Sequence, residues 1–172
     1  FYTDMACGPK YFTYINQELP TLCRRFFGIQ PVPERTYIMG LSMGGYGAMK
    51  CAFTAPQQYA GCAGFSSVAE IQAELPQLCR WHEDQAIFPH GIVPPQDDLF
   101  DLVEKFRDGT CPMPRLFLAC GQQDSLYPAN LRLRDTLQAM NWPLTWYEAP
   151  GDHNWFFWND ALGRAMKELL EN

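Results

Sequence analysis

The sequence is poor in positive charge, and this scarcity bears on the class of partner. It contains 13 Lys and Arg against 19 Asp and Glu, so its formal net charge is −6. No cluster of basic residues is larger than the pair Arg24–Arg25. A surface that binds nucleic acid requires a basic patch or stripe to neutralise phosphates. We therefore expect no nucleic-acid partner.

Long apolar runs and metal-binding spacings are also missing. No run approaches the roughly 18 apolar residues of a membrane-spanning helix, and the first residues do not have the pattern of a signal peptide. The seven cysteines are scattered, without a Cys-x-x-Cys pair or a close Cys/His cluster. Such a distribution favours neither a zinc site nor a disulfide framework. We expect no membrane association and no metal, and the scattered cysteines predict a reducing, cytoplasmic location.

The residues that are present have the pattern of one α/β domain. The chain has 172 residues, of which 47% are hydrophobic and 19% charged, as is typical of a single globular domain. Apolar runs predict strands at 36–39, 60–68, 115–120 and 144–148. Helical spacing predicts helices at 11–27 (kinked or divided at Pro20), 43–55, 69–80, 97–107, 131–140 and 154–170. Because strands alternate with helices, we expect a mostly parallel sheet with helices on both faces.

A sharp turn after the first predicted strand supplies a candidate nucleophile. Gly40-Leu41-Ser42-Met43-Gly44 matches the pattern G-x-S-x-G, in which a strained turn between strand and helix exposes the serine hydroxyl. The pattern is short, and the alternative is an ordinary glycine-rich loop. The strand–turn–helix context favours Ser42 as nucleophile. The backbone N–H of Met43, at the start of the following helix, is then a candidate oxyanion donor.

Two later loops supply candidate partners for Ser42. Where a serine nucleophile stands on such a turn of a parallel sheet, an Asp or Glu and then a His follow it along the chain. Asp124 follows the predicted strand 115–120, and His153 follows the predicted strand 144–148. Since carboxyl ends of parallel strands meet at one edge of a sheet, we expect these side chains to meet Ser42. His153 would be the base, and Asp124 would orient it.

Other residues compete for these two roles. The chain has three histidines, and His82 and His90 lie in the irregular middle segment, where surface or loop positions are the favoured interpretation. Asp152 is adjacent to His153, so its carboxylate would struggle to reach the ring while the ring faces Ser42. We expect Asp152 to cap the last helix instead, together with Asn154.

With these candidates in place, the surrounding residues resemble the esterase D family of α/β-hydrolases, which includes S-formylglutathione hydrolases and tributyrin-type acetylesterases. The resemblance rests on segments 1–4, 11–20, 40–48, 121–127 and 151–158. It implies the α/β-hydrolase fold and a serine carboxylesterase that hydrolyses small-molecule esters with short acyl chains, without a metal or organic cofactor. S-formylglutathione, feruloyl or acetylxylan esters are alternative substrates. A non-enzymatic scaffold is disfavoured, because Ser42, Asp124 and His153 are all present.

One departure from that family is plain. The fold needs four strands before the one that carries Ser42, and the chain has no room for them before residue 11. We therefore expect residues 1–172 to form the carboxyl-terminal portion of a single domain, without the early loop that supplies a second oxyanion donor. Its open sheet edge would pair with a second copy or with the missing amino-terminal segment, and the isolated chain would be weakly active or inactive.

The substrate pocket is less marked in the sequence. Tyr2, Trp155 and Phe156 are candidates to line the acyl pocket, although aromatic residues also commonly pack in a core. The segment 69–108 is a candidate partial lid, since an insertion there would overhang the carboxyl ends of the strands. Within it, Trp81 and Phe88 are candidate substrate contacts.

Overall fold

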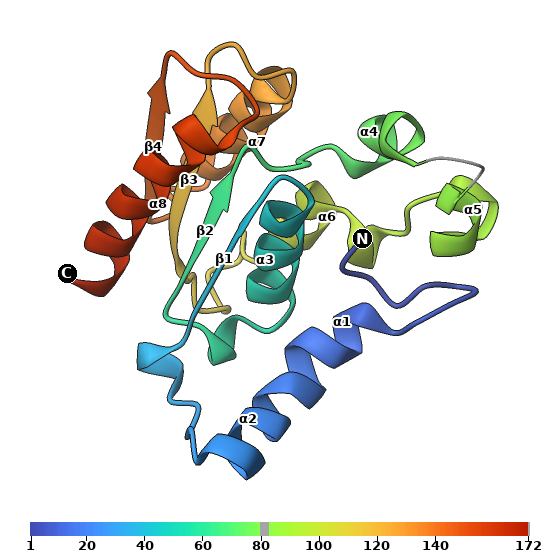
Figure 1. Ribbon diagram of the computed structural model, residues 1–172, viewed down its shortest axis with the longest axis vertical. Coiled ribbons are helices and arrows are strands. Elements are labelled where there is room, and N and C mark those ends of the chain that lie inside the picture. The colour runs from blue at the N-terminus through green and yellow to red at the C-terminus, as the bar shows by residue number, and fades with distance from the viewer. Residues whose placement is uncertain (80–82, 172) are drawn as a thin grey trace.

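The computed structural model describes residues 1–79 and 83–171 of the chain. Its strands form one parallel sheet in the order β1-β2-β3-β4, which is also their order in the sequence (Figure 1). The strands are β1 (Tyr37–Leu41), β2 (Gly61–Phe65), β3 (Arg115–Gly121) and β4 (Leu144–Ala149). The predicted parallel sheet is confirmed, and its strands end together at one edge of the sheet.

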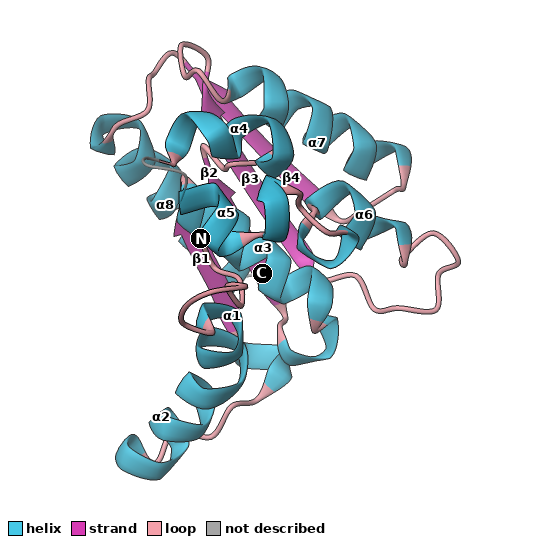
Figure 2. Cartoon of the chain, turned by 90° about the vertical axis from the view of Figure 1, so that its right-hand side faces the viewer, coloured by secondary structure: helices cyan, strands magenta, loops and turns pink. Residues whose placement is uncertain are grey.

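Helices cover both faces of this sheet, as expected. They are α1 (Tyr11–Thr13), α2 (Leu19–Phe27), α3 (Met43–Thr54), α4 (Ile71–Leu78), α5 (Glu83–Ile87), α6 (Leu99–Glu104), α7 (Tyr127–Ala139) and α8 (Trp155–Leu170). Buried side chains of α3, α6 and α7 pack on one face, and those of α8 pack on the other. Figure 2 shows α3, α6 and α7 in front of the sheet.

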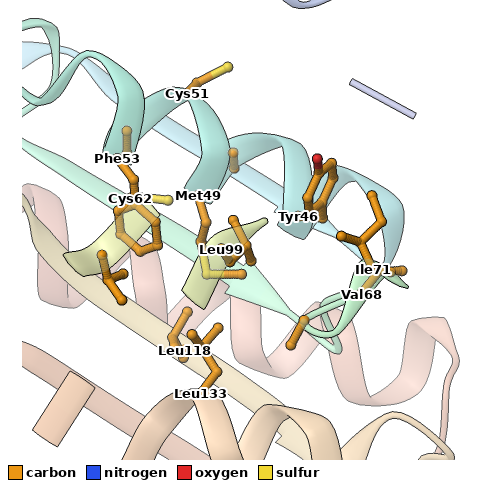
Figure 3. Close-up of a cluster of buried hydrophobic side chains, with 14 of the residues drawn as sticks. Tyr46, Met49, Cys51, Phe53, Cys62, Val68, Ile71, Leu99, Leu118 and Leu133 are labelled. Carbon is orange, nitrogen blue, oxygen red and sulfur yellow. The ribbon is translucent and has the colours of Figure 1, made fainter. Parts of the chain in front are cut away.

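The two-residue period of the strands separates two hydrophobic clusters. Cys62, Leu116 and Leu118 point to the face covered by α3, α6 and α7. Ala63 and Phe117, their neighbours in sequence, point to the α8 face. Figure 3 shows the first cluster, in which side chains of β2 and β3 meet those of α3, α4, α6 and α7. This packing fixes α3, and therefore its first residue, against the sheet.

The first helical segment differs from the prediction of a kink or a break at Pro20. The helical backbone continues from α1 through a π-helical turn, Tyr14–Glu18, into α2. Pro20 is the second residue of α2. Because a proline has no amide hydrogen to donate, the wider π turn before it accommodates the missing hydrogen bond. Asn16 is buried in this turn and accepts a hydrogen bond from the hydroxyl of Tyr59 at 2.8 Å.

Several other predicted boundaries were wrong by a few residues. Helix α7 begins at Tyr127 rather than at 131, with Pro128 in its first turn, a position that helices tolerate well. Strand β2 ends at Phe65 rather than at 68, because Ser66 has a positive φ of 46° that turns the chain out of the sheet. None of the helices in the described part of the chain is long and apolar enough to cross a membrane.

Candidate active site

Ser42 lies in a tight turn between the end of β1 and the start of α3. Its φ of 54° and ψ of −123° are strained for a residue with a side chain. Hydrogen bonds to β2 and the loop after it hold this conformation: the Ser42 amide donates to Phe65 O at 2.8 Å, and the Val68 amide donates to Ser42 O at 3.2 Å. A Cβ atom at Gly40 would lie 2.1 Å from the backbone oxygen of Gly44. The turn therefore requires glycine at position 40.

The structure brings the three candidate catalytic side chains together. Ser42 Oγ lies 2.9 Å from His153 Nε2, and His153 Nδ1 lies 2.8 Å from Asp124 Oδ2. A carboxylate can only accept, so it selects the tautomer in which Nδ1 carries the proton. Nε2 is then free to accept the proton of the Ser42 hydroxyl. The arrangement suits nucleophilic attack by serine with histidine as base.

The environment of Asp124 keeps its carboxyl group ionised. The residue is 3% exposed, and its Oδ1 accepts the backbone N–H of Leu126 at 2.9 Å. Burial alone would raise the pKa of Asp124, but hydrogen bonds from His153, Ser66 and Leu126 outweigh burial and lower it below its ordinary value. Asp124 is therefore a buried anion that can orient an imidazole and stabilise an imidazolium.

Met43 lies where an oxyanion donor is expected. It is the first residue of α3, so its amide has no acceptor within the helix. The amino-terminal end of a helix also carries partial positive charge. A negative oxygen formed on a substrate beside Ser42 would meet this amide.

A cavity of about 730 Å³ opens beside Ser42 and runs along the outer edge of β1. Tyr2 and Trp155 line it, as predicted, while its other walls come largely from β1, α3 and α8. Phe156, one position further along α8, does not line this cavity and is 93% exposed. A Cβ atom at Gly47 would lie 2.3 Å from Tyr2 Cδ2, so this glycine leaves space for the ring of Tyr2.

The middle segment contributes no described residue to the walls of this cavity. Phe88 is buried in the hydrophobic core, so it packs rather than facing the cavity. Trp81 and His82 lie outside the described residues. The role of 69–108 as a lid stays a prediction.

The last helix begins with one capping side chain rather than two. Asn154 Oδ1 accepts the amides of Phe156 at 3.0 Å and Phe157 at 3.4 Å. The prediction that Asp152 shares this role was wrong. Its Oδ1 accepts the amide of His153 at 2.7 Å, so it braces the loop before the helix.

Sequence reasoning missed two residues that surround the triad. Trp158, in α8, packs edge-on against His153, with ring centroids 4.9 Å apart and planes at 85°. Ser66 follows β2 and bonds to Trp158. Trp158 could not be singled out, because in the sequence it is typical of a core residue of an amphipathic helix. Ser66 could not be singled out, because nothing in the sequence indicates that a serine has a positive φ. Among the described residues, no group of three or more side chains has the arrangement of a metal site.

The curated relatives are longer esterases. The chain is 28% identical over 177 residues to an acetyl esterase of Caldicellulosiruptor saccharolyticus, covering 97% of this chain and 66% of the relative. It is 35% identical over 72 residues to the S-formylglutathione hydrolase of Bos taurus, covering 42% of this chain and 23% of that protein. The chain thus spans less than two thirds of the length of these relatives.

Solved structures agree on the fold. The fluorophosphonate-binding serine hydrolase F of Staphylococcus aureus superposes with a TM-score of 0.90 at 30% identity, covering 99% of this chain and 68% of that chain. The S-formylglutathione hydrolase FrmB of the same organism gives 0.77 at 30% identity, with coverages of 92% and 60%. Residues 3–107 match the model of the family named Esterase, described as "Putative esterase". The chain belongs to this esterase family and has the α/β-hydrolase fold.

Proposed function

We propose that the protein is a serine carboxylesterase that acts through Ser42, His153 and Asp124. The observation that carries this proposal is the continuous chain of hydrogen bonds from Ser42 Oγ to the buried carboxylate of Asp124, at 2.9 and 2.8 Å, on a strained strand–helix turn. Membership of the esterase family supports the same reaction.

The reaction follows from this geometry. His153 Nε2 takes the proton of Ser42 as its oxygen attacks the ester carbonyl, and Asp124 stabilises the imidazolium that forms. The carbonyl oxygen becomes an oxyanion that the Met43 amide stabilises. His153 then gives the proton to the departing alcohol, leaving an acyl group on Ser42. Water, activated by the same histidine, releases the acid and restores the enzyme.

A single backbone donor leaves the oxyanion only partly stabilised. In the α/β-hydrolase fold, the second donor comes from a loop that precedes the nucleophile strand. In the described part of the chain, β1 is the first strand of the sheet. We assign the second donor to a segment outside residues 1–172.

Short, neutral acyl esters fit the site best. The cavity beside Ser42 has largely apolar walls, and no charged side chain of residues 1–79 or 83–171 lines it. Glutathione conjugates carry several charges, so S-formylglutathione is the second candidate, favoured by the name of the FrmB structure. Feruloyl esters are a third, since a ferulic acid esterase shares the fold at 20% identity and a TM-score of 0.79. The cytoplasm is the proposed location, supported by the scattered positions of the seven cysteines, which include no Cys-x-x-Cys pair.

A labelling experiment tests the assignment of the nucleophile. A fluorophosphonate probe should modify Ser42 in the intact protein, and Ser42→Ala should abolish labelling. Ser67→Ala is the matched control, because Ser67 is also a buried serine near the turn but its Oγ has no hydrogen-bond partner within the described residues. Absence of an adduct at Ser42 in the intact protein would favour a non-enzymatic scaffold.

Substrate class is tested by rate comparison. The intact protein should hydrolyse p-nitrophenyl acetate with a higher kcat/KM than S-formylglutathione or methyl ferulate. A preference for S-formylglutathione would contradict the proposed substrate class while leaving the serine hydrolase assignment in place.

A further inference from the structure

Ser66 occupies a strained position next to the triad. Like Ser42, it has a positive φ, here 46°, and both serines directly follow neighbouring strands of the sheet. Its side chain is fully buried, and its amide donates to the oxygen of Ala119 in β3 at 2.7 Å. Strained non-glycine residues persist only where the surrounding structure holds them, and they concentrate at functional sites.

The hydroxyl of Ser66 has a fixed direction. The indole N–H of Trp158 can only donate, and it lies 3.1 Å from Ser66 Oγ, which must therefore accept. The thiol of Cys120 lies 3.8 Å from the same oxygen and also donates to it. The single hydroxyl hydrogen of Ser66 is left for the nearby carboxylate of Asp124, whose pKa this hydroxyl helps to lower.

Both partners of this hydroxyl contact His153. Asp124 holds the ring through Nδ1, and Trp158 packs edge-on against the same ring. The ring of His153 has two main freedoms, rotation about its side-chain bonds and displacement away from Ser42. The carboxylate restrains the first, and the indole blocks part of the second.

We propose that Ser66 is a positioning residue, whose hydroxyl locks Asp124 and Trp158 in the places from which they aim His153 at Ser42. This inference rests on the proposed function, because it concerns how the proposed base is held. Ser66 touches neither Ser42 Oγ nor the substrate cavity in any contact of the described structure. Its effect acts through other residues.

The proposal predicts a specific kinetic signature. Without the Ser66 hydroxyl, the carboxylate of Asp124 loses one hydrogen-bond donor, so its negative charge interacts more strongly with the imidazolium. The carboxylate also loses one restraint on its orientation. The ring of His153 should then spend less time aimed at Ser42, and the acid limb of the kcat/KM profile should move to higher pH. Misplacement of a catalytic group by about 1 Å lowers rates on the order of 100-fold.

Other titrating groups near Asp124 have to be considered in such a profile. Burial raises the pKa of the Cys120 thiol to about 12, outside the range of the measurement. Burial also raises the pKa of Glu74 to about 7, and this carboxyl interacts with Asp124. Glu74 is present in wild type and variants alike, so the displacement between their profiles is the quantity to compare.

The test uses four variants of the intact protein. In Ser66→Ala, kcat should fall on the order of 10- to 100-fold, KM should change by less than about twofold, and the acid limb of the kcat/KM profile should move up by roughly half a pH unit. Ser66→Gly lacks the hydroxyl but accepts the positive φ, so it should lose as much activity as Ser66→Ala. Trp158→Phe keeps a ring against His153 but loses the N–H, and its kcat should fall less. Ser67→Ala should match wild type.

The outcomes separate this inference from the proposed function. If wild type labels at Ser42 but Ser66→Ala retains the activity and pH profile of Ser67→Ala, the positioning role is wrong and the esterase assignment stands. Recovery of activity in Ser66→Gly would also overturn it, because the loss would then come from the backbone rather than the hydroxyl. Failure of wild type to label overturns the proposed function and this inference together.

Discussion

The ring of Tyr2 fills the space that the missing side chain of Gly47 leaves next to Ser42. The ring of Tyr2 lies where a side chain at position 47 would be, and it lines the cavity beside Ser42. A residue from the very start of the chain therefore forms part of the proposed acyl pocket. The contact connects the amino-terminal segment directly to substrate binding.

Gly47→Ala should disturb both stability and the pocket. The new Cβ would lie 2.3 to 2.7 Å from three atoms of Tyr2, so the ring has to move. Overpacking of this kind costs about 1–3 kcal/mol, and the displaced ring should raise KM for p-nitrophenyl acetate. Thermal melting and steady-state kinetics measure the two effects.

Gly44→Ala is the matched control, because its Cβ would meet Tyr2 at 3.7 Å, an ordinary contact distance. Equal melting temperatures for the two alanine variants would contradict the steric role of Tyr2.

At the scale of elements, helix α4 carries a carboxyl group, that of Glu74, whose surroundings disfavour its charged form. Burial, followed by the nearby charge of Glu70, raises the pKa of Glu74 from 4.5 to about 7, against a hydrogen bond from the Glu70 amide that lowers it. The folded protein therefore binds this proton more tightly than the unfolded chain. Glu74 contributes stability below about pH 4.5, and this contribution is lost as the pH rises through 7.

Glu74→Gln should consequently be more stable than wild type at pH 8, by about 1–2 kcal/mol after allowance for the partial exposure of the group. At pH 4.5 the difference should largely vanish, because the protonated carboxyl and the amide are then similar. Urea unfolding at both pH values measures this difference in the free energy of unfolding. Glu34→Gln, on an exposed turn, is the control, and an equal gain at both pH values would contradict the interpretation.

The elements themselves show what the sequence could predict. Strands β1 to β4 were all expected, because buried parallel strands are short apolar runs bounded by turn residues. The loops after them placed Ser42, Asp124 and His153, since chain order and strand ends restrict where such residues can lie. Ser66 could not be predicted, because its role depends on a positive φ and on contacts with residues 54 and 92 positions away.

Helix ends and side-chain directions were predicted less well for a related reason. The start of α7 at Tyr127 depends on a turn in which the Tyr127 amide donates to Asp124 O, a contact made by the loop rather than by an apolar pattern. Phe156 and Trp155 are neighbours in α8, and only the packing of that helix decides which of them faces the cavity. Local pattern sets the element, and tertiary contact sets its details.

At the scale of the whole molecule, a buried ion pair connects three distant parts of the chain. Lys50 of α3 pairs with Asp97, and the Thr3 hydroxyl donates to the same carboxylate oxygen at 2.7 Å. The Tyr46 hydroxyl donates to the backbone oxygen of Asp97 at 2.7 Å. Burial lowers the pKa of Lys50, while Asp97 opposes that effect. The cluster joins the amino-terminal segment, helix α3 and the middle segment.

Asp97→Asn should therefore destabilise the whole fold. It removes the countercharge of a buried ammonium group, and breaking a buried pair in this way costs about 3–5 kcal/mol. Thr3→Val removes one hydrogen bond to the same carboxylate and should cost about 1 kcal/mol. Guanidinium unfolding compares the two, and a smaller loss for Asp97→Asn than for Thr3→Val would show that the ion pair is not the main link.

The sheet has an open side at β1, which pairs only with β2 among the described strands. Such an edge offers unpaired backbone groups to another strand. Residues 1–172 produced alone should therefore self-associate, as sedimentation velocity would show. Their kcat on p-nitrophenyl acetate should be lower than that of the intact protein by a factor on the order of 10²–10³. A loss of this size is usual when one oxyanion donor is missing. A monomer with full turnover would contradict both expectations.

The crowding around the turn at Ser42 has a consequence for how this protein can change. A side chain cannot be added at Gly40, where a Cβ atom would lie 2.1 Å from the backbone oxygen of Gly44. Mutational routes to new substrates are closed there, whatever the selection applied. In laboratory evolution of specificity, successful substitutions should instead occur at Tyr2, Trp155 and Leu162, whose side chains line the cavity.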